Sequence, residues 1–386
     1  MEKRRIPWPG LGTVYDEAEW NAVTAILRRC MDENEGIDVR YVGAEFERTF
    51  AVMTGANEAV AVNSCGTALD IATMILNPNP GDEFITTPLT FICTATTVIA
   101  QGATVRFADI DEKTWNIDPK SIEACVNGRT RAIYPVHYAG LACDMARILG
   151  IAERKGLAVV EDAAHALGTT HQGKPVGGLG DMTAFSFQSM KNMTTLGEGG
   201  LLTTNNAEYA KAAREIRSFG FDYSRGTSVR LGTNLRMTLP QAAVGLTQLD
   251  KVERLNRRRR ELAGLMNEKL AEVDEIQLPL LPNDDQHPVH LYTIYLNERT
   301  AGMNRAEFRK LLNEECGVDT RANYNPVYDH EVLRQRGYDG SGTPVADRIC
   351  RGLVNLPLHP SYTEADVNFI AAGVKQTLAG RFSGTH

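Results

Sequence analysis

The chain has 386 residues, of which 43% are hydrophobic and 23% charged, the composition of a globular protein and not of a disordered one. Its 41 basic and 48 acidic residues give a formal net charge of −7, so there is no basic footprint for nucleic acid. No apolar stretch reaches the length of a membrane span, and the charged start of the sequence lacks the apolar core of a signal peptide.

Short apolar runs alternate with helix-like stretches over the first two thirds of the chain. Strands are expected at 59–62, 83–86, 103–107, 131–136, 157–160, 184–187 and 201–204, and a helix is expected at 68–76. Strands separated by helices predict an α/β fold with a mainly parallel central sheet flanked by helices. Such sheets bind ligands at the carboxyl ends of their strands.

A long helix is predicted from about Pro240 through Leu270, and the pattern changes after it. This helix contains four consecutive arginines, 257–260, which fit a solvated helix face better than a site that attracts an anionic substrate. A strand at 291–296 and helices near 305–315 and 364–378 then indicate a smaller α+β unit. We expect a large domain over 1–250 and a small C-terminal domain over 251–386.

The seven cysteines are scattered, and no two have the Cys-x-x-Cys spacing. Their number is odd, so a disulfide framework or a zinc site is not expected, and no metal site is predicted. This cysteine usage is typical of a cytoplasmic protein.

Several nucleotide and hydrolase motifs are missing. The chain contains no complete Gly-x-Gly-x-x-Gly between a strand and a helix and no P-loop. It also contains no Gly-x-Ser-x-Gly and no His-Glu-x-x-His. These absences argue against a nicotinamide-dependent dehydrogenase, a P-loop nucleotidase, a serine hydrolase of the α/β type and a zinc protease.

The segment 63–68, Asn-Ser-Cys-Gly-Thr-Ala, joins a predicted strand to a predicted helix. A helix N-terminus with Gly66 and Thr67 offers free N–H groups and the positive end of the helix dipole to a phosphate. The alternative is an ordinary helix cap formed by Ser64 or Thr67.

Two acids and a histidine follow the strand predicted at 157–160, within the segment Glu-Asp-Ala-Ala-His from Glu161 to His165. A carboxylate at this position could hold a heteroaromatic nitrogen in its protonated form, because the paired charges raise the pKa of that nitrogen. The alternative is that Glu161 and Asp162 cap a turn.

A single lysine, Lys191, follows an aromatic strand and precedes the glycine-rich segment 197–200. A partly desolvated lysine amine has a lowered pKa and can serve as a Schiff-base nucleophile. Most isolated lysines are surface charges, but this one has few charged neighbours.

Together these segments resemble the DegT/DnrJ/EryC1/StrS family of sugar aminotransferases, pyridoxal-phosphate (PLP) enzymes of fold type I. The family signature reads Glu-Asp-Ala-Ala-His-Ala, then Gly-Asp, Phe-Ser-Phe-x-x-x-Lys and Gly-Glu-Gly-Gly. The chain carries it in the same order and spacing at 161–166, 180–181, 185–191 and 197–200. The resemblance extends over nearly the whole chain and implies the aspartate-aminotransferase architecture.

The resemblance also implies roles for individual residues. Lys191 would form the Schiff base with PLP and move the substrate proton, and Asp162 would pair with the pyridinium nitrogen. The remaining cofactor contacts would be Gly66, Thr67 and Ser186 on the phosphate, Phe91 on the ring face, His165 near the phenolic oxygen, and Asn234 reaching the phosphate of a partner subunit. The last contact implies a homodimer with shared active sites.

Three further positions match substrate-facing places in the family: Gln188, His290 and Tyr324. Many relatives have histidine at the position of Gln188, so contacts near the substrate could differ here. Relatives with histidine at the position of Lys191 catalyse dehydration, and the lysine therefore favours transamination.

The sequence thus predicts a cytoplasmic, homodimeric, PLP-dependent aminotransferase with a ping-pong mechanism. The expected donor is L-glutamate or L-glutamine, and the expected acceptor is a keto sugar, most often a nucleotide-linked keto-deoxy sugar. No nucleic acid or membrane partner is expected. The alternatives are a keto-cyclitol or another natural-product precursor as acceptor, a PLP-dependent sugar dehydratase, and a non-catalytic PLP-binding regulator.

Overall fold

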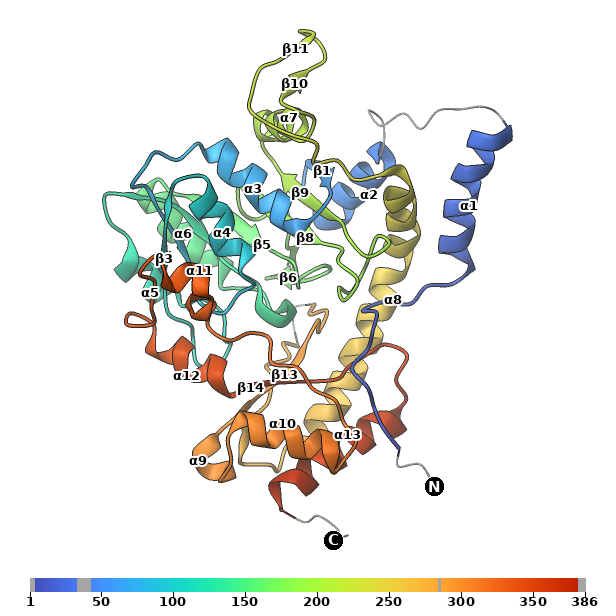
Figure 1. The fold of residues 1–386 in the computed structure, drawn as a ribbon, viewed down its shortest axis with the longest axis vertical. Coiled ribbons are helices and arrows are strands. Elements are labelled where there is room, and N and C mark those ends of the chain that lie inside the picture. Colours follow the sequence, from blue (N-terminus) through green and yellow to red (C-terminus); the bar gives the residue numbers. More distant parts are fainter. Residues whose placement is uncertain (1–3, 33–42, 284–285, 381–386) are drawn as a thin grey trace.

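The computed structural model describes residues 4–32, 43–283 and 286–380 (Figure 1). Its main layer is a seven-stranded sheet in the order β1-β9-β8-β5-β4-β2-β3. The strands are β1 (Glu58–Val62), β2 (Glu83–Thr86), β3 (Thr104–Phe107), β4 (Thr130–Tyr134), β5 (Ala158–Asp162), β8 (Met182–Ser186) and β9 (Gly200–Thr204). Each of these strands overlaps a run that the sequence analysis expected.

The pairings from β8 through β5, β4 and β2 to β3 are all parallel, as predicted. β9 is the exception, because it runs antiparallel to both β1 and β8. The chain returns from β8 to β9 through the loop that contains Lys191, without a crossover helix. This direct return reverses the strand direction and places the lysine loop at the carboxyl end of β8.

Helices cover both faces of the sheet. In β1, Val60 and Val62 belong to one buried cluster, whereas Ala59 and Ala61 belong to another, as the alternation of side chains along a strand requires. The first face is covered by α3 (Cys65–Leu76), α4 (Cys93–Ala100) and α7 (Ala207–Ile216). The opposite face is covered by α2 (Ala44–Thr54), α5 (Pro119–Cys125), α6 (Met145–Lys155) and part of α8 (Leu239–Leu270).

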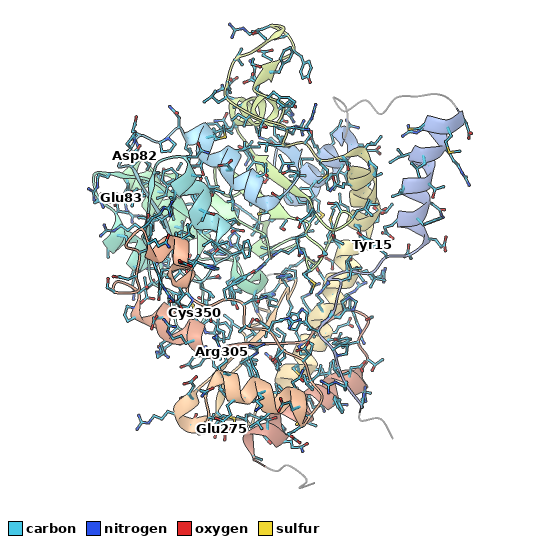
Figure 2. All side chains as sticks on the ribbon, in the orientation of Figure 1. Tyr15, Asp82, Glu83, Glu275, Arg305 and Cys350 are labelled. Atoms are coloured by element: carbon cyan, nitrogen blue, oxygen red, sulfur yellow. The ribbon has the colours of Figure 1, made fainter. Side chains whose placement is uncertain are left out.

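A second, three-stranded antiparallel sheet packs against the far half of α8. It consists of β12 (Ile276–Gln277), β13 (Tyr292–Leu296) and β14 (Leu353–Leu356). The helices α9 (Glu298–Ala301), α10 (Arg305–Glu314), α12 (Pro344–Gly352) and α13 (Glu364–Leu378) accompany it. The 3₁₀ turn η2 (Val327–Asp329) and α11 (Glu331–Arg334) instead pack into a core of the large sheet through Val327 and Leu333. Glu275 and Arg305 mark this smaller unit in Figure 2, and Asp82 and Glu83 mark the β2 end of the large sheet.

Helix α8 connects the two units without a break. Ala242 and Val252 pack into a core of the large sheet, and Leu262 and Met266 pack into the core of the small one. The helix therefore continues through residue 250, where the sequence analysis divides the chain. That division stays a prediction.

The remaining elements lie outside these layers. They are α1 (Glu17–Asp32), the 3₁₀ turn η1 (Tyr138–Gly140), the small hairpin of β6 (Thr170–His171) with β7 (Lys174–Pro175), and the hairpin of β10 (Phe221–Asp222) with β11 (Thr227–Ser228). The last hairpin projects away from the body of the molecule (Figure 1). No helix within the described ranges combines the length and hydropathy needed to cross a bilayer.

Residues 6–13 form an extended segment that we call the N-terminal strap. Ile6 is hydrogen-bonded on both sides, from its N–H to Gly317 O at 2.8 Å and from Asp319 N–H to its carbonyl oxygen at 3.0 Å. Thr13 donates through Oγ1 to Gln248 Oε1 at 2.7 Å. The strap therefore joins the start of the chain to the small unit and to α8.

Candidate active site

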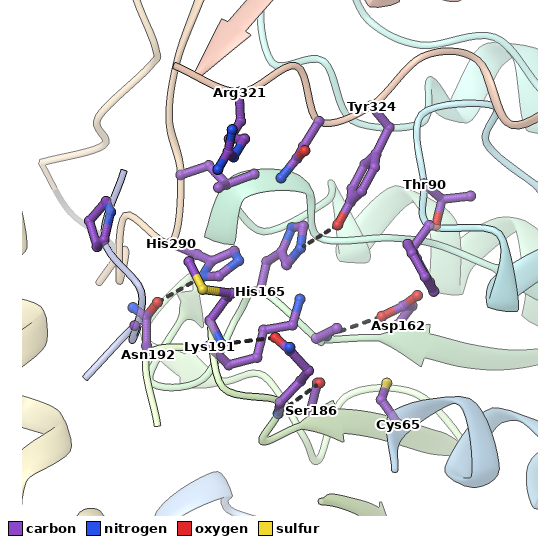
Figure 3. A pocket seen from close by; sticks show the side chains of 18 of the residues that line it. Cys65, Thr90, Asp162, His165, Ser186, Lys191, Asn192, His290, Arg321 and Tyr324 are labelled. Atoms are coloured by element: carbon purple, nitrogen blue, oxygen red, sulfur yellow. Dashed lines mark hydrogen bonds between the residues drawn. The ribbon is translucent and has the colours of Figure 1, made fainter. Parts of the chain in front are cut away.

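A cavity of about 920 Å³ lies where the carboxyl ends of the β-strands, the N-terminal strap and the small unit meet (Figure 3). All but two of the predicted site residues line it, although they come from widely separated parts of the chain. These lining residues are Gly66, Phe91, Asp162, His165, Ser186, Gln188, Lys191, His290 and Tyr324. The described residues hold no cluster of three or more His, Cys, Asp or Glu that could bind a metal ion.

The floor of the cavity includes the N-terminus of α3. Ser64 caps this helix, and its Oγ accepts the Thr67 N–H at 3.1 Å. Helix geometry leaves the N–H groups of Cys65 and Gly66 without acceptors inside the helix, and both residues line the cavity. Gly200, at the start of β9, packs directly on this turn, because a Cβ atom there would overlap the backbone of Ser64 and Cys65. The arrangement is an anion site of the helix-N-terminus type.

Asp162 ends β5 and is 3% exposed. Its Oδ2 accepts the Thr94 hydroxyl at 2.7 Å, and its Oδ1 accepts the Ala164 N–H at 3.1 Å. No lysine or arginine nitrogen among the described residues lies within ion-pair distance of this carboxylate. A buried carboxylate without a cation calls for a positively charged or N–H-bearing partner in the cavity.

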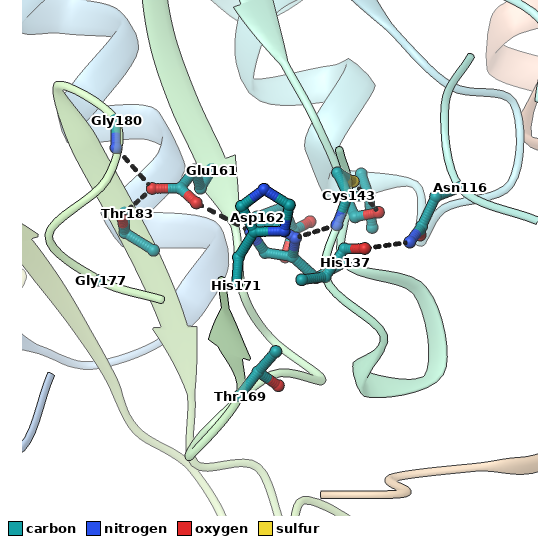
Figure 4. A network of polar contacts seen from close by, with 12 residues as sticks. Asn116, His137, Cys143, Glu161, Asp162, Thr169, His171, Gly177, Gly180 and Thr183 are labelled. Carbon is teal, nitrogen blue, oxygen red and sulfur yellow. Dashed lines mark hydrogen bonds and ion pairs between the residues drawn. The ribbon is translucent and has the colours of Figure 1, made fainter. Parts of the chain in front are cut away.

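A second buried network lies behind Asp162 (Figure 4). The His137 and Glu161 side chains are fully buried, and His137 Nε2 lies 2.9 Å from Glu161 Oε2. Glu161 Oε1 also accepts the Gly180 N–H and the Thr183 hydroxyl, both at 2.8 Å. Since His137 N–H in turn donates to Asp162 O, this network fixes the backbone that carries the cavity carboxylate.

Lys191 follows a tight turn that Gln188 stabilises. The Lys191 N–H donates to Gln188 O at 2.8 Å, and Gln188 Oε1 accepts the Met190 N–H at 2.8 Å. Burial lowers the pKa of Lys191, although the nearby Asp162 carboxylate acts in the opposite direction. The amine therefore carries a larger neutral fraction than an exposed lysine, as a nucleophile or base requires.

Two histidines and a tyrosine form the wall opposite Lys191. His165 Nδ1 accepts the Ala139 N–H at 3.3 Å, which leaves its Nε2–H for the Tyr324 hydroxyl at 3.4 Å. His290 Nδ1 lies 2.9 Å from Asn192 Oδ1, an acceptor, so this nitrogen carries the hydrogen. Burial and the neighbouring Lys191 lower the pKa of both histidines well below the usual value, and both rings are neutral.

Phe91 lines the cavity but is 56% exposed, with its ring centroid 6.0 Å from that of Tyr324. The two predicted residues outside the lining are Thr67 and Asn234. Thr67 lies one position further into α3, where its hydroxyl donates to Asn63 Oδ1 at 2.6 Å. Asn234 is exposed and accepts from Arg236 Nε at 2.9 Å. Its predicted reach into a partner subunit stays a prediction.

The N-terminal strap and two polar side chains of the site are not predicted from the sequence. Trp8, Gly10 and Gly12 of the strap line the cavity, and so do Arg259 and Asn192. The glycines and prolines near the start of the chain indicate a close backbone approach, but one sequence does not show to what. The sequence favours a solvated helix face for the four consecutive arginines, but one of the four, Arg259, is buried.

The model of the DegT/DnrJ/EryC1/StrS aminotransferase family matches residues 16–375. Spore coat polysaccharide biosynthesis protein SpsC of Bacillus subtilis is 40% identical over 348 residues, which cover 87% of this chain and 89% of SpsC. GDP-perosamine synthase of Caulobacter vibrioides is 36% identical over 362 residues, which cover 90% and 93% of the two chains. The PLP form of Spr1654 from Streptococcus pneumoniae is 26% identical, with a TM-score of 0.87 over 98% of this chain and 99% of that one.

The fold and these comparisons define the class as a PLP-dependent aminotransferase of fold type I. The chain belongs to the DegT/DnrJ/EryC1/StrS aminotransferase family. Its cavity chemistry fits the cofactor in three separate ways. The α3 N-terminus offers N–H groups to a phosphate, and Lys191 offers an amine. Asp162, which has no cationic partner among the described residues, is free to pair with a pyridinium nitrogen.

Proposed function

We propose that this aminotransferase moves an amino group from L-glutamate or L-glutamine to a keto sugar carried on a nucleotide. The observation that carries the proposal is the meeting of Lys191, the unpaired Asp162 carboxylate and the α3 N-terminus in one cavity of about 920 Å³. A phosphate, an aromatic nitrogen and a reacting carbonyl carbon each have a complementary group there.

In the proposal, PLP supplies an electron sink for the carbon that gains or loses the amino group. Gly66 and Ser186 bind its phosphate, with Thr67 supporting the turn, and Phe91 packs on its ring. Asp162 holds the ring nitrogen protonated, since Thr94 and the Ala164 N–H orient both carboxylate oxygens. His165 lies near the phenolic oxygen and is held by Ala139 and Tyr324.

Lys191 is the proposed Schiff-base lysine and the group that moves the proton. With PLP bound, Lys191 would hold the cofactor as a Schiff base, and its free amine would be the base that takes and moves the proton of the donor α-carbon. A lowered pKa keeps this amine neutral often enough to act as the base. The acceptor step then uses the same group in the reverse direction.

Two relatives support a sugar acceptor. One is named a spore coat polysaccharide biosynthesis protein, and another is named GDP-perosamine synthase. The second name contains a nucleotide-linked sugar, which supports the nucleotide part of the proposal.

We also infer a homodimer with shared sites. Asn234 lies in an exposed segment next to Leu231, which is 87% exposed, and Phe219 nearby is also exposed. A second copy that covers this apolar patch would bring Asn234 toward a neighbouring cavity.

The test begins with absorbance spectra of the purified holoenzyme before and after L-glutamate and then L-glutamine. The expected result is conversion of the cofactor band with one or both donors, and loss of this response in Lys191→Ala. The aminated cofactor form is next mixed with nucleotide-linked keto sugars and with a keto-cyclitol, and the return of the original band is followed.

Each outcome separates the alternatives. Recovery with the cyclitol alone would contradict the nucleotide-sugar acceptor. A bound cofactor that neither donor changes would contradict the proposed donors and leave a dehydratase or a non-catalytic PLP-binding protein. An unchanged response in Lys191→Ala would remove Lys191 from its proposed role.

A further inference from the structure

Arg259 is a buried cation of α8. It is 2% exposed and lines the cavity, and no carboxylate of the described residues forms an ion pair with it. Its guanidinium donates to the carbonyl oxygen of Gly12 and, at 3.5 Å, to Asn256 Oδ1. An arginine has five N–H donors, so two are used and three are left.

A buried charge with neutral acceptors alone is costly to the folded state. Burial lowers the pKa of Arg259 to about 9, which still leaves the side chain protonated at neutral pH. The other three arginines of the run differ, because Arg257 is exposed and both Arg258 and Arg260 have carboxylate partners in Glu261 and Glu253. Of the four consecutive arginines, three are therefore either exposed or paired with a carboxylate. Arg259 alone among these four is buried and could take an anion from the cavity.

Arg259 is also close to the reacting lysine. Gly12, whose carbonyl oxygen accepts from Arg259, donates its own N–H to Ser189 O at 2.8 Å. A Cβ atom at Gly12 would overlap the carbonyl groups of Met190 and Lys191. The backbone of Gly12 therefore lies between the Arg259 guanidinium and the turn that carries Lys191.

We propose that Arg259 is the subsite for the α-carboxylate of the amino donor. The proposal rests on the proposed function, since it takes an α-amino acid as the donor. The α-carboxylate is the anion that L-glutamate and L-glutamine share, and it is bonded to the carbon whose amino group reacts. A guanidinium binds such a carboxylate through two parallel N–H···O bonds.

Two other assignments fit less well. The diphosphate of a nucleotide sugar is separated from the reacting carbon by the sugar ring, whereas Arg259 lies deep and next to the lysine turn. Arg321 also lines the cavity, but its side chain is half exposed, lies 3.9 Å from the Asp319 carboxylate and stacks over Trp8. Arg321 is thus placed at the rim, where a larger and more distant anion would bind.

The test compares the holoenzyme with Arg259→Met, Arg259→Lys and the control Arg257→Met, which removes an exposed charge two positions earlier on the same helix. Stopped-flow absorbance gives the apparent dissociation constant of L-glutamate in the donor half-reaction. We expect Arg259→Met to raise this constant about 10- to 100-fold, Arg259→Lys to raise it less, and Arg257→Met to leave it within about threefold.

Two further measurements distinguish binding of a carboxylate from support of the strap. The reaction with 4-aminobutyrate, which lacks the α-carboxylate, should be the same in Arg259→Met and the wild type. The rate of the acceptor half-reaction should also be unchanged. Calorimetric titration of the PLP form with 2-oxoglutarate should show binding to the wild type and its loss in Arg259→Met, without reliance on turnover.

The outcomes are separable. A wild type that reacts with neither amino acid and binds no 2-oxoglutarate overturns the proposed donor and the subsite with it. A wild type that reacts normally, together with an Arg259→Met variant of equal donor affinity, overturns the subsite alone. Equal losses with L-glutamate, 4-aminobutyrate and the acceptor would show a structural role through Gly12. If Arg259→Met does not fold, unchanged donor affinity in Arg259→Ala or Arg259→Gln overturns the subsite.

Discussion

The ring centroids of His165 and His290 lie 4.2 Å apart, yet the two Nδ1 atoms have opposite hydrogen-bonding roles. His165 receives a backbone N–H on Nδ1, whereas His290 donates from Nδ1 to Asn192 Oδ1. Both rings are neutral, because burial lowers the pKa of each. His290 thus keeps an unprotonated Nε2, and Asn192 is the group that fixes it in this tautomer.

Asn192→Asp should change the protonation of His290. A carboxylate in place of the amide would accept the same Nδ1–H and stabilise the charged ring, which raises the pKa of His290. We expect the acidic limb of the donor half-reaction to move to higher pH, measured as rate against pH by stopped-flow. Asn192→Leu should lower the rate without this shift. An identical pH profile in all three proteins would argue against control of His290 by Asn192.

Thr94→Val should weaken cofactor binding. The substitution keeps the shape of the side chain and removes the hydroxyl that donates to Asp162 at 2.7 Å. Loss of a hydrogen bond to a charged group should raise the dissociation constant of PLP by about tenfold, measured by fluorescence titration of the apoenzyme. Thr97→Val is the matched control, since the hydroxyl of Thr97 donates to the Cys93 carbonyl oxygen within the same helix. Equal effects of the two variants would contradict the prediction.

Gly200→Ala should disturb the α3 N-terminus. The added methyl group would overlap the backbone of Ser64 and Cys65, so either β9 or the helix cap has to move. We expect a loss of about 1–3 kcal/mol in the free energy of unfolding, measured with urea, together with weaker PLP binding. Gly128→Ala is the control, because a Cβ atom there would meet no atom of the described residues within 4 Å. A variant as stable as wild type with unchanged PLP affinity would show that the contact is dispensable.

Stability should fall as the pH drops from about 6.5 toward 4, in part because of His287. Burial, with help from Arg260, lowers the pKa of this histidine to about 4, and Nδ1 accepts the Val289 N–H at 2.8 Å. Between these pH values the unfolded chain binds a proton that the folded chain does not, so the contribution present above pH 6.5 is lost on acidification. A shift of this size corresponds to about 3 kcal/mol.

His287→Asn keeps an acceptor near the position of Nδ1 and removes the titration. Urea unfolding at several pH values should therefore show a flatter acid dependence for His287→Asn than for wild type. His330→Gln, at an exposed position, should retain the slope of the wild type. A His287→Asn slope equal to that of wild type would assign the acid sensitivity to other groups.

Much of the fold follows from local patterns. The strands of the large sheet were predictable because short apolar runs alternate with helical stretches, and α13 was predictable from a helical pattern at 364–378. The antiparallel direction of β9 could not be predicted, because the residues of a strand do not indicate in which direction its neighbours run. The position of β9 beside β8 depends on the loop that contains Lys191. The path of this loop depends in turn on packing against the strap and α3.

Some residues of the candidate site are likewise predictable from the sequence, and others are not. Lys191 and Asp162 could be named from motif spacing, since both belong to one signature, with Asp162 at the end of β5 and Lys191 in the loop after β8. Arg259 could not be named, because four adjacent arginines look alike in sequence and only the rotation of α8 buries one of them. Asn192 is similar: it lies next to Lys191, but its role depends on His290, 98 residues further along the chain.

The N-terminal strap also affects the order in which parts of the protein can fold during translation. Its hydrogen bonds run to Ser189, Gln248, Gly317, His359 and Tyr362, so a segment synthesised before the large sheet has partners as far along the chain as Tyr362. The large sheet can assemble while translation continues, but the hydrogen bonds of the strap are complete only after His359 and Tyr362 have emerged. A nascent chain that has already folded its β-strands is therefore still without a finished pocket.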